Sequence, residues 1–439
     1  MKHLAKGSKK LLNAWAFYDW ANSVYSLVIV SAIFPIFYGA ITIVKNEQGA
    51  ILSDTVPFLG INFNNDSLIS YVTALAFLVV SLISPVLSGI ADYIGNKKFF
   101  LKFFCYLGAF STIGLFWFDL NFLWFGLLCY FLALIGFWAS LVFYNSYLPD
   151  IAFPDQQDKI SARGFSMGYI GSVILLIICL IMILKYDWFG FEDEELPTRL
   201  SFVLTGVWWI GFSQYTYYYL PKGNKGQKFT RNILFNGFRE FKSIWISLKA
   251  QIRLKSYLMA FFVYSMAVQT IMLIATYFGI EELDWGTQDP TTGLIVSILL
   301  IQLVAIAGAT LTSRTALKIG NIKTLIFLNI FWIMICVYAY FITTPFQFYI
   351  AAASVGLIMG GTQALSRSTY SKMLPEGTLD TTSYFSFYDV SEKIGIVIGM
   401  VLYGIIAQIT GSVRSSILFL VIFFIVGVFL LFRVPAEKQ

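Results

Sequence analysis

Residues that carry enzyme chemistry are scarce in this 439-residue sequence. It has one histidine, His3, and four cysteines that fall inside apolar runs at unrelated spacings. A catalytic triad or proton relay built on histidine inside the protein is therefore excluded, and disulfide or metal-site spacing is absent. The sequence also lacks a phosphate-binding loop, which excludes direct coupling to ATP. We therefore predict no enzyme activity, no bound metal and no cofactor.

Charged residues are too few for a water-facing surface. They make up 12% of the chain, whereas 58% of its residues are apolar and 18% are aromatic; soluble domains are nearer a quarter charged. The net charge of +6 would by itself suit nucleic acid. Its basic residues, however, gather in short loops between long apolar runs, which favours a lipid bilayer as the partner and excludes nucleic acid.

Twelve apolar runs are long enough to cross a bilayer as helices, because a spanning helix needs about 20 apolar residues. The breaks between them hold Lys, Asp, Asn, Gly and Pro, as expected for loops that cannot face lipid. The predicted spans are 15–44, 68–90, 99–118, 122–148, 162–184, 199–220, 257–280, 291–313, 324–343, 347–370, 383–408 and 415–432.

A basic segment separates the first six spans from the last six. Its stretch from Pro221 to Lys255 carries nine Lys or Arg residues and one acid, Glu240. Basic loops stay on the cytoplasmic side, so this segment and both termini are predicted to be cytoplasmic. Its apolar residues recur at helical spacing, which favours an amphipathic helix on the anionic inner leaflet over an ordinary linker. The predicted units are residues 1–220, a six-helix bundle; 221–256, the linker; and 257–439, a second bundle.

The two halves repeat each other at three places with nearly the same offset. Two related halves joined by a basic inner loop are typical of secondary transporters. The matched positions are Gly95-Asn96 with Gly320-Asn321, Leu148-Pro149 with Leu374-Pro375, and Gly171 with Gly395.

The turn between the second and third spans reads GIADYIGNKK, which resembles the signature of the major facilitator superfamily. In that family the turn is a latch that holds one conformation shut at the cytoplasmic side; the alternative is a generic basic loop. Glycine permits close helix approach, the acid caps a helix end or pairs across the halves, and the lysines reach lipid headgroups. Leu317 replaces the acid in the second copy, so the latch is expected to be stronger in the first half. The predicted latch residues are Gly89, Asp92, Gly95, Lys97 and Lys98.

The first span carries a polar stripe within AWAFYDWANSVYS. Asp19 lies about one turn inside the membrane, where a carboxylate costs roughly 2.5–3.5 kcal/mol. Trp15, Asn22 and Ser26 share its helix face, and Tyr18 adjoins it. Asp19 either binds a cationic group of the solute or a coupling proton, or it only positions the helix; the sequence leaves both interpretations open.

Four motifs narrow the resemblance to one branch of the superfamily. YDWANS, YNSYLPDIA with Tyr144 and Asn145, SARGFSMGYIG and GGTQALSRS are similar to the branch that contains the vacuolar amino-acid effluxers of fungal autophagy and bacterial permeases. This resemblance, from Trp15 to Phe432, implies a twelve-helix facilitator with amino acids as its substrate class. Relatives often carry an acid followed by Gly where this chain has Met266-Ala267.

The eleventh span contains three ionisable residues, Asp389, Glu392 and Lys393. Asp389 and Lys393 are four residues apart and can pair along one helix face, which lowers the cost of both charges. The resemblance places a lysine at position 393. The group either meets a substrate carboxylate and changes partners during transport, or forms a static ion pair near the inner rim.

The tenth and seventh spans supply further polar candidates. Gln363 lies deeper than Arg367, which could offer its fork to an anionic group but is favoured as an anchor at the inner end of the span. Tyr264 and Gln269 of the seventh span are expected to face the same cavity.

These patterns together predict an all-α membrane protein with twelve transmembrane helices in two pseudo-symmetric six-helix bundles. The expected function is alternating-access transport of a small polar solute, foremost amino acids or short peptides, by a monomer in the bacterial plasma membrane. Coupling to protons and uniport both stay open. The alternatives are a lipid flippase of the same fold and a non-transporting membrane receptor or assembly factor.

Overall fold

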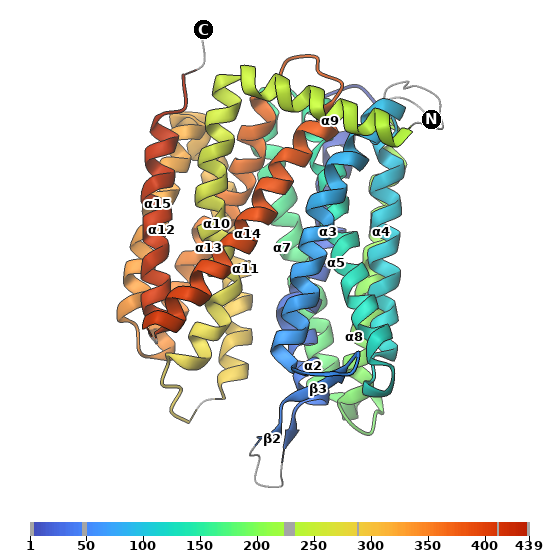
Figure 1. The fold of residues 1–439 in the computed structure, drawn as a ribbon, viewed down its shortest axis with the longest axis vertical. Helices are drawn as coiled ribbons and strands as arrows, with labels where there is room; N and C mark the ends of the chain where they lie inside the picture. The colour runs from blue at the N-terminus through green and yellow to red at the C-terminus, as the bar shows by residue number, and fades with distance from the viewer. Residues whose placement is uncertain (1–3, 46–50, 224–232, 288, 411, 437–439) are drawn as a thin grey trace.

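The computed structural model describes residues 4–45, 51–223, 233–287, 289–410 and 412–436, and long helices dominate it (Figure 1). Eleven of the described helices are long and apolar enough to cross a membrane by length and composition. A further helix, α8 (Glu195–Tyr219), has 25 residues, stands in the place of the sixth span and is less apolar than the other eleven. The predicted twelve-helix fold in two bundles is confirmed.

The first bundle contains the chain up to α8. Its first span is one continuous helix whose middle, η1, has π-helical hydrogen bonding. Its elements are α1 (Lys9–Val24), η1 (Tyr25–Ile33), α2 (Phe34–Thr42), β1 (Val44–Lys45), β2 (Ile51–Ser53), β3 (Thr55–Phe58), β4 (Ile61–Asn64), α3 (Asn65–Ile94), α4 (Lys97–Gly114), η2 (Leu115–Trp117), η3 (Leu120–Phe122), α5 (Leu123–Asn145), α6 (Leu148–Ile151), α7 (Pro154–Leu184), η4 (Tyr186–Phe189) and α8. The strands pair antiparallel, β1 with β2 and β3 with β4.

The second bundle follows a helix that lies across the end of the molecule (Figure 1). The elements are α9 (Ile233–Ala250), α10 (Ile252–Glu281), α11 (Pro290–Ile319), α12 (Asn321–Phe341), α13 (Pro345–Lys372), α14 (Thr381–Thr410) and α15 (Val413–Phe432). Each bundle buries its own apolar core, one drawn from residues 11–220 and the other mainly from residues 244–434. Tyr169 of α7 is the member of the second core that comes from the first bundle.

Several helices extend past their predicted ends because polar residues prolong them beyond the apolar run. α7 begins at Pro154, where the side chain of Gln156 accepts a hydrogen bond from the Phe153 amide. α10 begins at Ile252, earlier than the predicted residue 257. A 30-residue helix is about 45 Å long, against a hydrocarbon core of about 30 Å, so these helices project beyond the bilayer.

The repeated Gly-Asn turns adopt related conformations in the two halves. Gly95 and Gly320 have φ angles of +68° and +89°, a region that glycine enters without the steric cost of a Cβ. α4 begins at Lys97, directly after its turn, with Asn96 accepting a hydrogen bond from the Phe99 amide, whereas α12 begins one position earlier in the repeat, at Asn321. The repeat found in the sequence thus marks the start of a helix in each half.

Close packing of α11 against α13 depends on glycine, and we predict that Gly308→Ala destabilises the protein. A Cβ at Gly308 would overlap the carbonyl oxygen of Leu357, which is backbone and cannot move aside. Overpacking of this kind costs about 1–3 kcal/mol, so the thermal unfolding midpoint should fall. Gly211→Ala in α8 is the matched control, because nothing beyond its chain neighbours and the nearby backbone of its own helix lies within 4 Å of the position that its added methyl group would take. Equal midpoints for the two variants would contradict this prediction.

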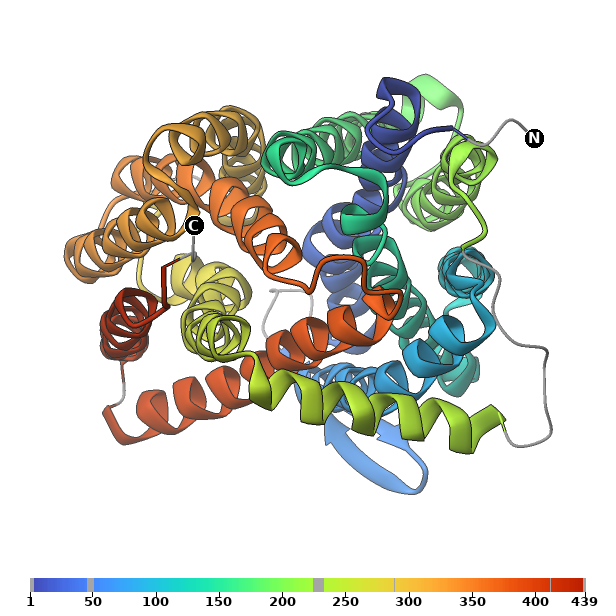
Figure 2. The same cartoon turned by 90° about the horizontal axis from the view of Figure 1, so that it is seen from above.

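The helix α9 lies within the predicted linker, whose residues 224–232 fall outside the described residues. Its apolar side packs on protein instead of facing lipid: Ile244 and Leu248 are buried against the second bundle's core. Figure 2 shows α9 running along one edge of the molecule, and it contacts both α3 and α14. The side of the molecule with α9 and both chain ends is called the α9 side below.

Candidate functional site

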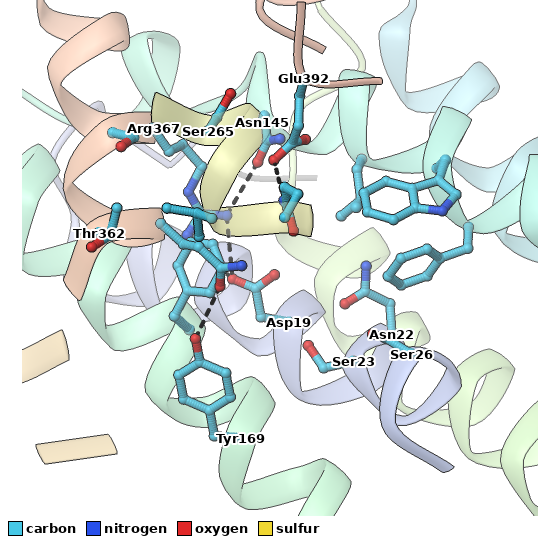
Figure 3. Close-up of a pocket in the computed structure, with 18 of the residues that line it drawn as sticks. Asp19, Asn22, Ser23, Ser26, Asn145, Tyr169, Ser265, Thr362, Arg367 and Glu392 are labelled. Carbon is cyan, nitrogen blue, oxygen red and sulfur yellow. Dashed lines mark hydrogen bonds and ion pairs between the residues drawn. The ribbon is translucent and has the colours of Figure 1, made fainter. Parts of the chain in front are cut away.

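A cavity of about 180 Å³ lies between the two bundles, with residues of both in its wall (Figure 3). Nine residues that the sequence analysis named line it: Asp19, Asn22, Ser26, Asn145, Tyr264, Gln269, Gln363, Arg367 and Glu392. Pockets for drug-sized ligands are about 300–1,000 Å³, so this volume suits a smaller molecule.

An ion pair joins the bundles at one end of this cavity. The Arg367 Nη2 of α13 lies 3.3 Å from the Asp19 Oδ2 of α1, and both side chains are almost fully buried. Tyr144 donates its hydroxyl to the same Asp19 oxygen at 2.8 Å. Asp19 of the first predicted span and Arg367 of the tenth therefore meet at the interface between the bundles.

Every donor of the Arg367 guanidinium is engaged. Nε donates to Ser161 Oγ at 3.0 Å, and Nη2 donates to the Ser161 carbonyl at 3.0 Å. Nη1 donates to Asn145 Oδ1 at 3.1 Å, and the remaining two donors face Asp19. A guanidinium has five N–H groups, and all five have acceptors here. No pair of N–H donors is therefore left to bind a solute carboxylate in this conformation. The prediction of an anchor at the membrane surface is wrong, because Arg367 lies buried between the bundles.

Aromatic rings and a glycine enclose the ion pair. The rings of Trp15 and Phe165 lie 4.8 Å and 4.3 Å from the Arg367 guanidinium carbon, where cation–π attraction contributes. Trp15 also stacks on Tyr144, with ring centroids 4.6 Å apart. A Cβ at Gly164 would overlap the Asp19 carboxylate, so this glycine permits α7 to approach α1. Trp15 and Tyr144 thus contact the ion pair but are not among the residues that line the cavity.

A second charged group lies on α14. Lys393 pairs with Asp389, as the four-residue spacing predicts, and its Nζ is also 3.2 Å from Glu392 Oε2. The ring of Trp138, from α5 of the first bundle, has its centroid 4.1 Å from the same Nζ. Lys393 and Asp389 are buried, whereas Glu392 faces the cavity and accepts a hydrogen bond from Gln269 at 2.7 Å. One lysine therefore serves two carboxylates.

Two further polar groups in the cavity wall have no hydrogen-bond partner among the residues that the structure describes. The Asn22 side-chain nitrogen and the Gln302 side-chain oxygen are buried without a hydrogen bond. A buried amide without a partner costs free energy, so these atoms are suited to a polar ligand. Asn22 lies in α1 just before the π-helical turns of η1, and such turns are frequent at functional sites.

Sequence reasoning found some of this site and missed other parts. Tyr18 is buried in the first bundle between Tyr144 and Tyr217, away from the cavity. Trp138 was missed because a lone aromatic residue in an apolar span carries no signal. Gln302 could have been found, since it is a polar residue within the apolar run LLIQLVA. The lining residues that were not selected include Ser23, Trp138, Phe165, Tyr169, Ser172, Phe261, Ser265, Gln302, Thr362, Ser366 and Tyr388.

The predicted latch spans the two bundles on the α9 side. Asp92 at the end of α3 accepts hydrogen bonds from the backbone amides of Ser383 at 2.7 Å and Thr382 at 3.3 Å, in the first turn of α14. This acid thus occupies the positive end of a helix in the opposite bundle. Gly89 lies buried within α3. Lys97 donates to the Thr381 hydroxyl at 2.9 Å and pairs with Asp150 at 2.5 Å.

The latch lysines do not reach outward to lipid headgroups as the sequence analysis expected. Lys97 and Lys98 are both buried, and Lys98 donates to the Leu220 carbonyl at 2.7 Å. Both lysine ammonium groups donate to oxygen atoms of the protein and not to lipid headgroups.

The bundles meet along two lines of contact on the α9 side, which are called seams below: one at Asp92 and α14, the other at α7 and the turn that contains Asn321. At the second seam the acid comes from the first bundle. Position 317 has leucine in place of the acid, but Asp158 of α7 pairs with Lys372 at 2.5 Å and accepts from Asn321 at 2.9 Å. Asn321 belongs to the repeated Gly-Asn turn. The first bundle contributes the carboxylate at both seams, but Asp92 accepts from helix amides, whereas Asp158 contacts the side chains of Lys372 and Asn321.

We predict that Asp92→Ala loosens the contact between α3 and α14. Two helix amides lose a charged acceptor, and such hydrogen bonds contribute about 1.5–3 kcal/mol each. A cysteine introduced as Ser146→Cys, at a buried position beside Thr382, should then react faster with a thiol reagent. Asp289→Ala is the matched control: Asp289 also accepts from two helix amides, those of Thr291 and Thr292, but within one bundle. The prediction fails if both variants label alike.

Solved structures of transporters share this architecture. The major facilitator superfamily transporter FucP, in the outward conformation, superposes with a TM-score of 0.69 at 12% identity, covering 98% of this chain and 99% of that chain. The human organic anion transporter MFSD10 gives a TM-score of 0.69 at 10% identity, covering 96% of this chain and 99% of that one. Two six-helix bundles around a central polar cavity are the fold of these major facilitator superfamily structures, and this chain has the same fold.

The family within that superfamily follows from the sequence comparisons. Residues 7–439 match the family described as "Vacuole effluxer Atg22 like". The chain is 31% identical to the Bacillus subtilis protein "Uncharacterized MFS-type transporter YxiO", over 99% of this chain and 97% of that protein. "Autophagy-related protein 22-2" of Emericella nidulans is 23% identical over 87% of this chain and 79% of its own length. The chain belongs to the Atg22-like effluxer family, and the resemblance stated from its motifs is confirmed.

Proposed function

We propose that this protein is an alternating-access permease for small zwitterionic solutes, foremost amino acids and short peptides. The proposal rests on one observation: the first bundle offers a hydrogen-bond donor to the cavity, whereas the second offers a negatively charged acceptor. Asn22 on the first bundle presents an unpartnered amide nitrogen, and Glu392 on the second presents a carboxylate. A solute carboxylate can accept from the first, and its ammonium group can donate to the second.

The charge balance of the cavity supports an ammonium group. Asp19 and Arg367 balance each other, whereas Asp389 and Glu392 share Lys393. The ionised group on α14 therefore carries one excess negative charge, and its cavity-facing member is Glu392. A buried charge without a partner is costly, so a cation or a proton at Glu392 would be stabilising. The Atg22-like family name, "Vacuole effluxer", is compatible with this solute class.

We further propose that the α9 side faces the cytoplasm and that this conformation is outward-facing. The positive-inside rule places the basic linker and termini there. Latch contacts from Asp92, Lys97 and Asp158 close the seams between the bundles on that side. Alternating access then requires these contacts to break while the cavity opens toward the cytoplasm.

Coupling to protons is proposed to use Glu392. Protonation of Glu392 would remove the excess negative charge and leave Lys393 and Asp389 as a neutral pair. A bound ammonium group would neutralise the same excess charge, so a proton and the solute's ammonium group can replace each other there. Asp19 is less suited to a mobile proton because Arg367 and Tyr144 already hold its carboxylate. A uniporter would show no dependence of transport on a proton gradient.

The test begins with thermal unfolding of the purified protein against amino acids, dipeptides, sugars and lysolipids. A compound that raises the midpoint is then followed by counterflow in proteoliposomes, with and without a pH gradient. Asn22→Ala and Glu392→Gln should abolish both signals. Glu376→Gln, which neutralises an exposed acid on the α9 side, is the matched control and should retain them.

Failure has distinct forms in this experiment. Stabilisation by lysolipids alone would replace the proposal with lipid transport, and stabilisation by sugars alone would change the solute class. Binding of amino acids without counterflow would favour a receptor. Retained counterflow in Glu392→Gln would remove the ammonium site from that residue.

A further inference from the structure

The inner face of α9 joins the two bundles at the seam closed by Asp92. Ile244 and Leu248 are buried there, and α9 packs along α3 of the first bundle. Phe241 stacks on Phe387 of α14, with ring centroids 4.6 Å apart and planes 14° from parallel. Phe387 lies one helical turn beyond Ser383, whose amide donates to Asp92.

Hydrogen bonds add to this apolar contact. Ser247 of α9 lies 3.1 Å from the Tyr384 hydroxyl, and Gln251 Nε2 donates to the same hydroxyl at 2.9 Å. Tyr384 belongs to the first turn of α14 and is buried. Because α3 and α14 belong to different bundles, a helix that contacts both must release one of them when this seam opens.

The opposite face of α9 is basic and aromatic. Arg239, Lys242 and Lys249 are exposed along it, and helical geometry places them on one side, away from Ile244 and Leu248. The exposed apolar residues beside them are Phe238, Trp245 and Ile246. Figure 1 shows α9 lying across the ends of the long helices. Helices that cross a bilayer end near its surface. Basic residues interleaved with Trp and Phe in such a position complement anionic headgroups.

We propose that α9 is a lipid-anchored clamp on the α3–α14 seam. Its inner face fastens the two bundles together, and its outer face binds anionic phospholipid at the membrane surface. Anionic lipid therefore stabilises the conformation in which this seam is closed. The inference requires the membrane-spanning fold but not the proposed solute.

The lipid contact is tested with the full chain in nanodiscs of phosphatidylcholine, with or without phosphatidylglycerol. The readout is the labelling rate of Ser146→Cys by a maleimide; the four native cysteines are buried. Phosphatidylglycerol should slow labelling. The triple variant Arg239→Gln, Lys242→Gln, Lys249→Gln should lose this response. The control variant Lys9→Gln, Lys10→Gln, Lys159→Gln removes the same charge from exposed sites elsewhere and should keep it.

The clamp itself is tested in phosphatidylcholine alone. Phe241→Ala removes one stacked ring pair and should speed labelling of Ser146→Cys about fivefold. Phe238→Ala truncates an exposed phenylalanine on the outer face and should leave the rate unchanged. An equal lipid response in both triple variants would overturn the lipid contact. Wild-type labelling in Phe241→Ala would overturn the clamp.

Discussion

Arg367→Gln is expected to destabilise the protein severely and to abolish transport. The substitution removes the only guanidinium beside Asp19 among the described residues and leaves that carboxylate buried with one hydroxyl donor, Tyr144. Breaking a buried ion pair from one side costs about 3–5 kcal/mol, because the remaining charge is uncompensated. The thermal unfolding midpoint of the purified protein measures this loss.

The double variant Asp19→Asn, Arg367→Gln distinguishes the cost of an unpaired buried charge from the loss of the ion pair itself. Removing both charges removes the uncompensated carboxylate, so most of the lost stability should return. Transport should not return, because the ion pair that joins the bundles is still absent. Glu195→Gln removes the exposed carboxylate of an ion pair whose arginine, Arg199, also donates to the carbonyls of Phe116 and Phe118. This variant should change the midpoint little, since an ion pair with a solvent-exposed partner contributes about 0–1 kcal/mol. A similar midpoint for Arg367→Gln and Glu195→Gln would contradict the expected role of the buried pair.

Sequence periodicity identified the helices because the bilayer imposes one strong requirement on each. Every span needs a continuous apolar run, and the breaks between runs are polar. The helix ends were placed less well, because polar residues such as Asp155 and Gln156 continue α7 outside the hydrocarbon. The latch acid Asp92 was found because its motif is local.

Contacts between the bundles were beyond local reasoning. Arg367 and Asp19 are far apart in the sequence, and Arg367 stands near a helix end where anchors are common. Only the packing of α1, α5, α7 and α13 shows that its donors meet Asp19, Asn145 and Ser161. The role of α9 was similarly hidden, because an amphipathic pattern does not tell whether lipid or protein covers the apolar side.

Lys393→Gln is expected to have the second large effect. Lys393 is fully buried and is the cation shared by Asp389 and Glu392. Its loss leaves two carboxylates close together, so repulsion adds to the cost of burying an unpaired charge. It also removes the cation from the Trp138 ring across the bundle interface. The unfolding midpoint should fall at least as far as in Arg367→Gln.

Second substitutions show which carboxylate causes that loss. Adding Asp389→Asn to Lys393→Gln removes the fully buried acid and should restore most of the stability, whereas adding Glu392→Gln should restore less, because Glu392 faces the cavity and keeps its Gln269 contact in the parent. Glu392→Gln alone should leave the midpoint near that of wild type, since Lys393 and Asp389 remain a balanced pair. Equal recovery from the two added substitutions would mean that the carboxylates are equally buried, and the assignment of Glu392 as the cavity-facing charge would then be wrong.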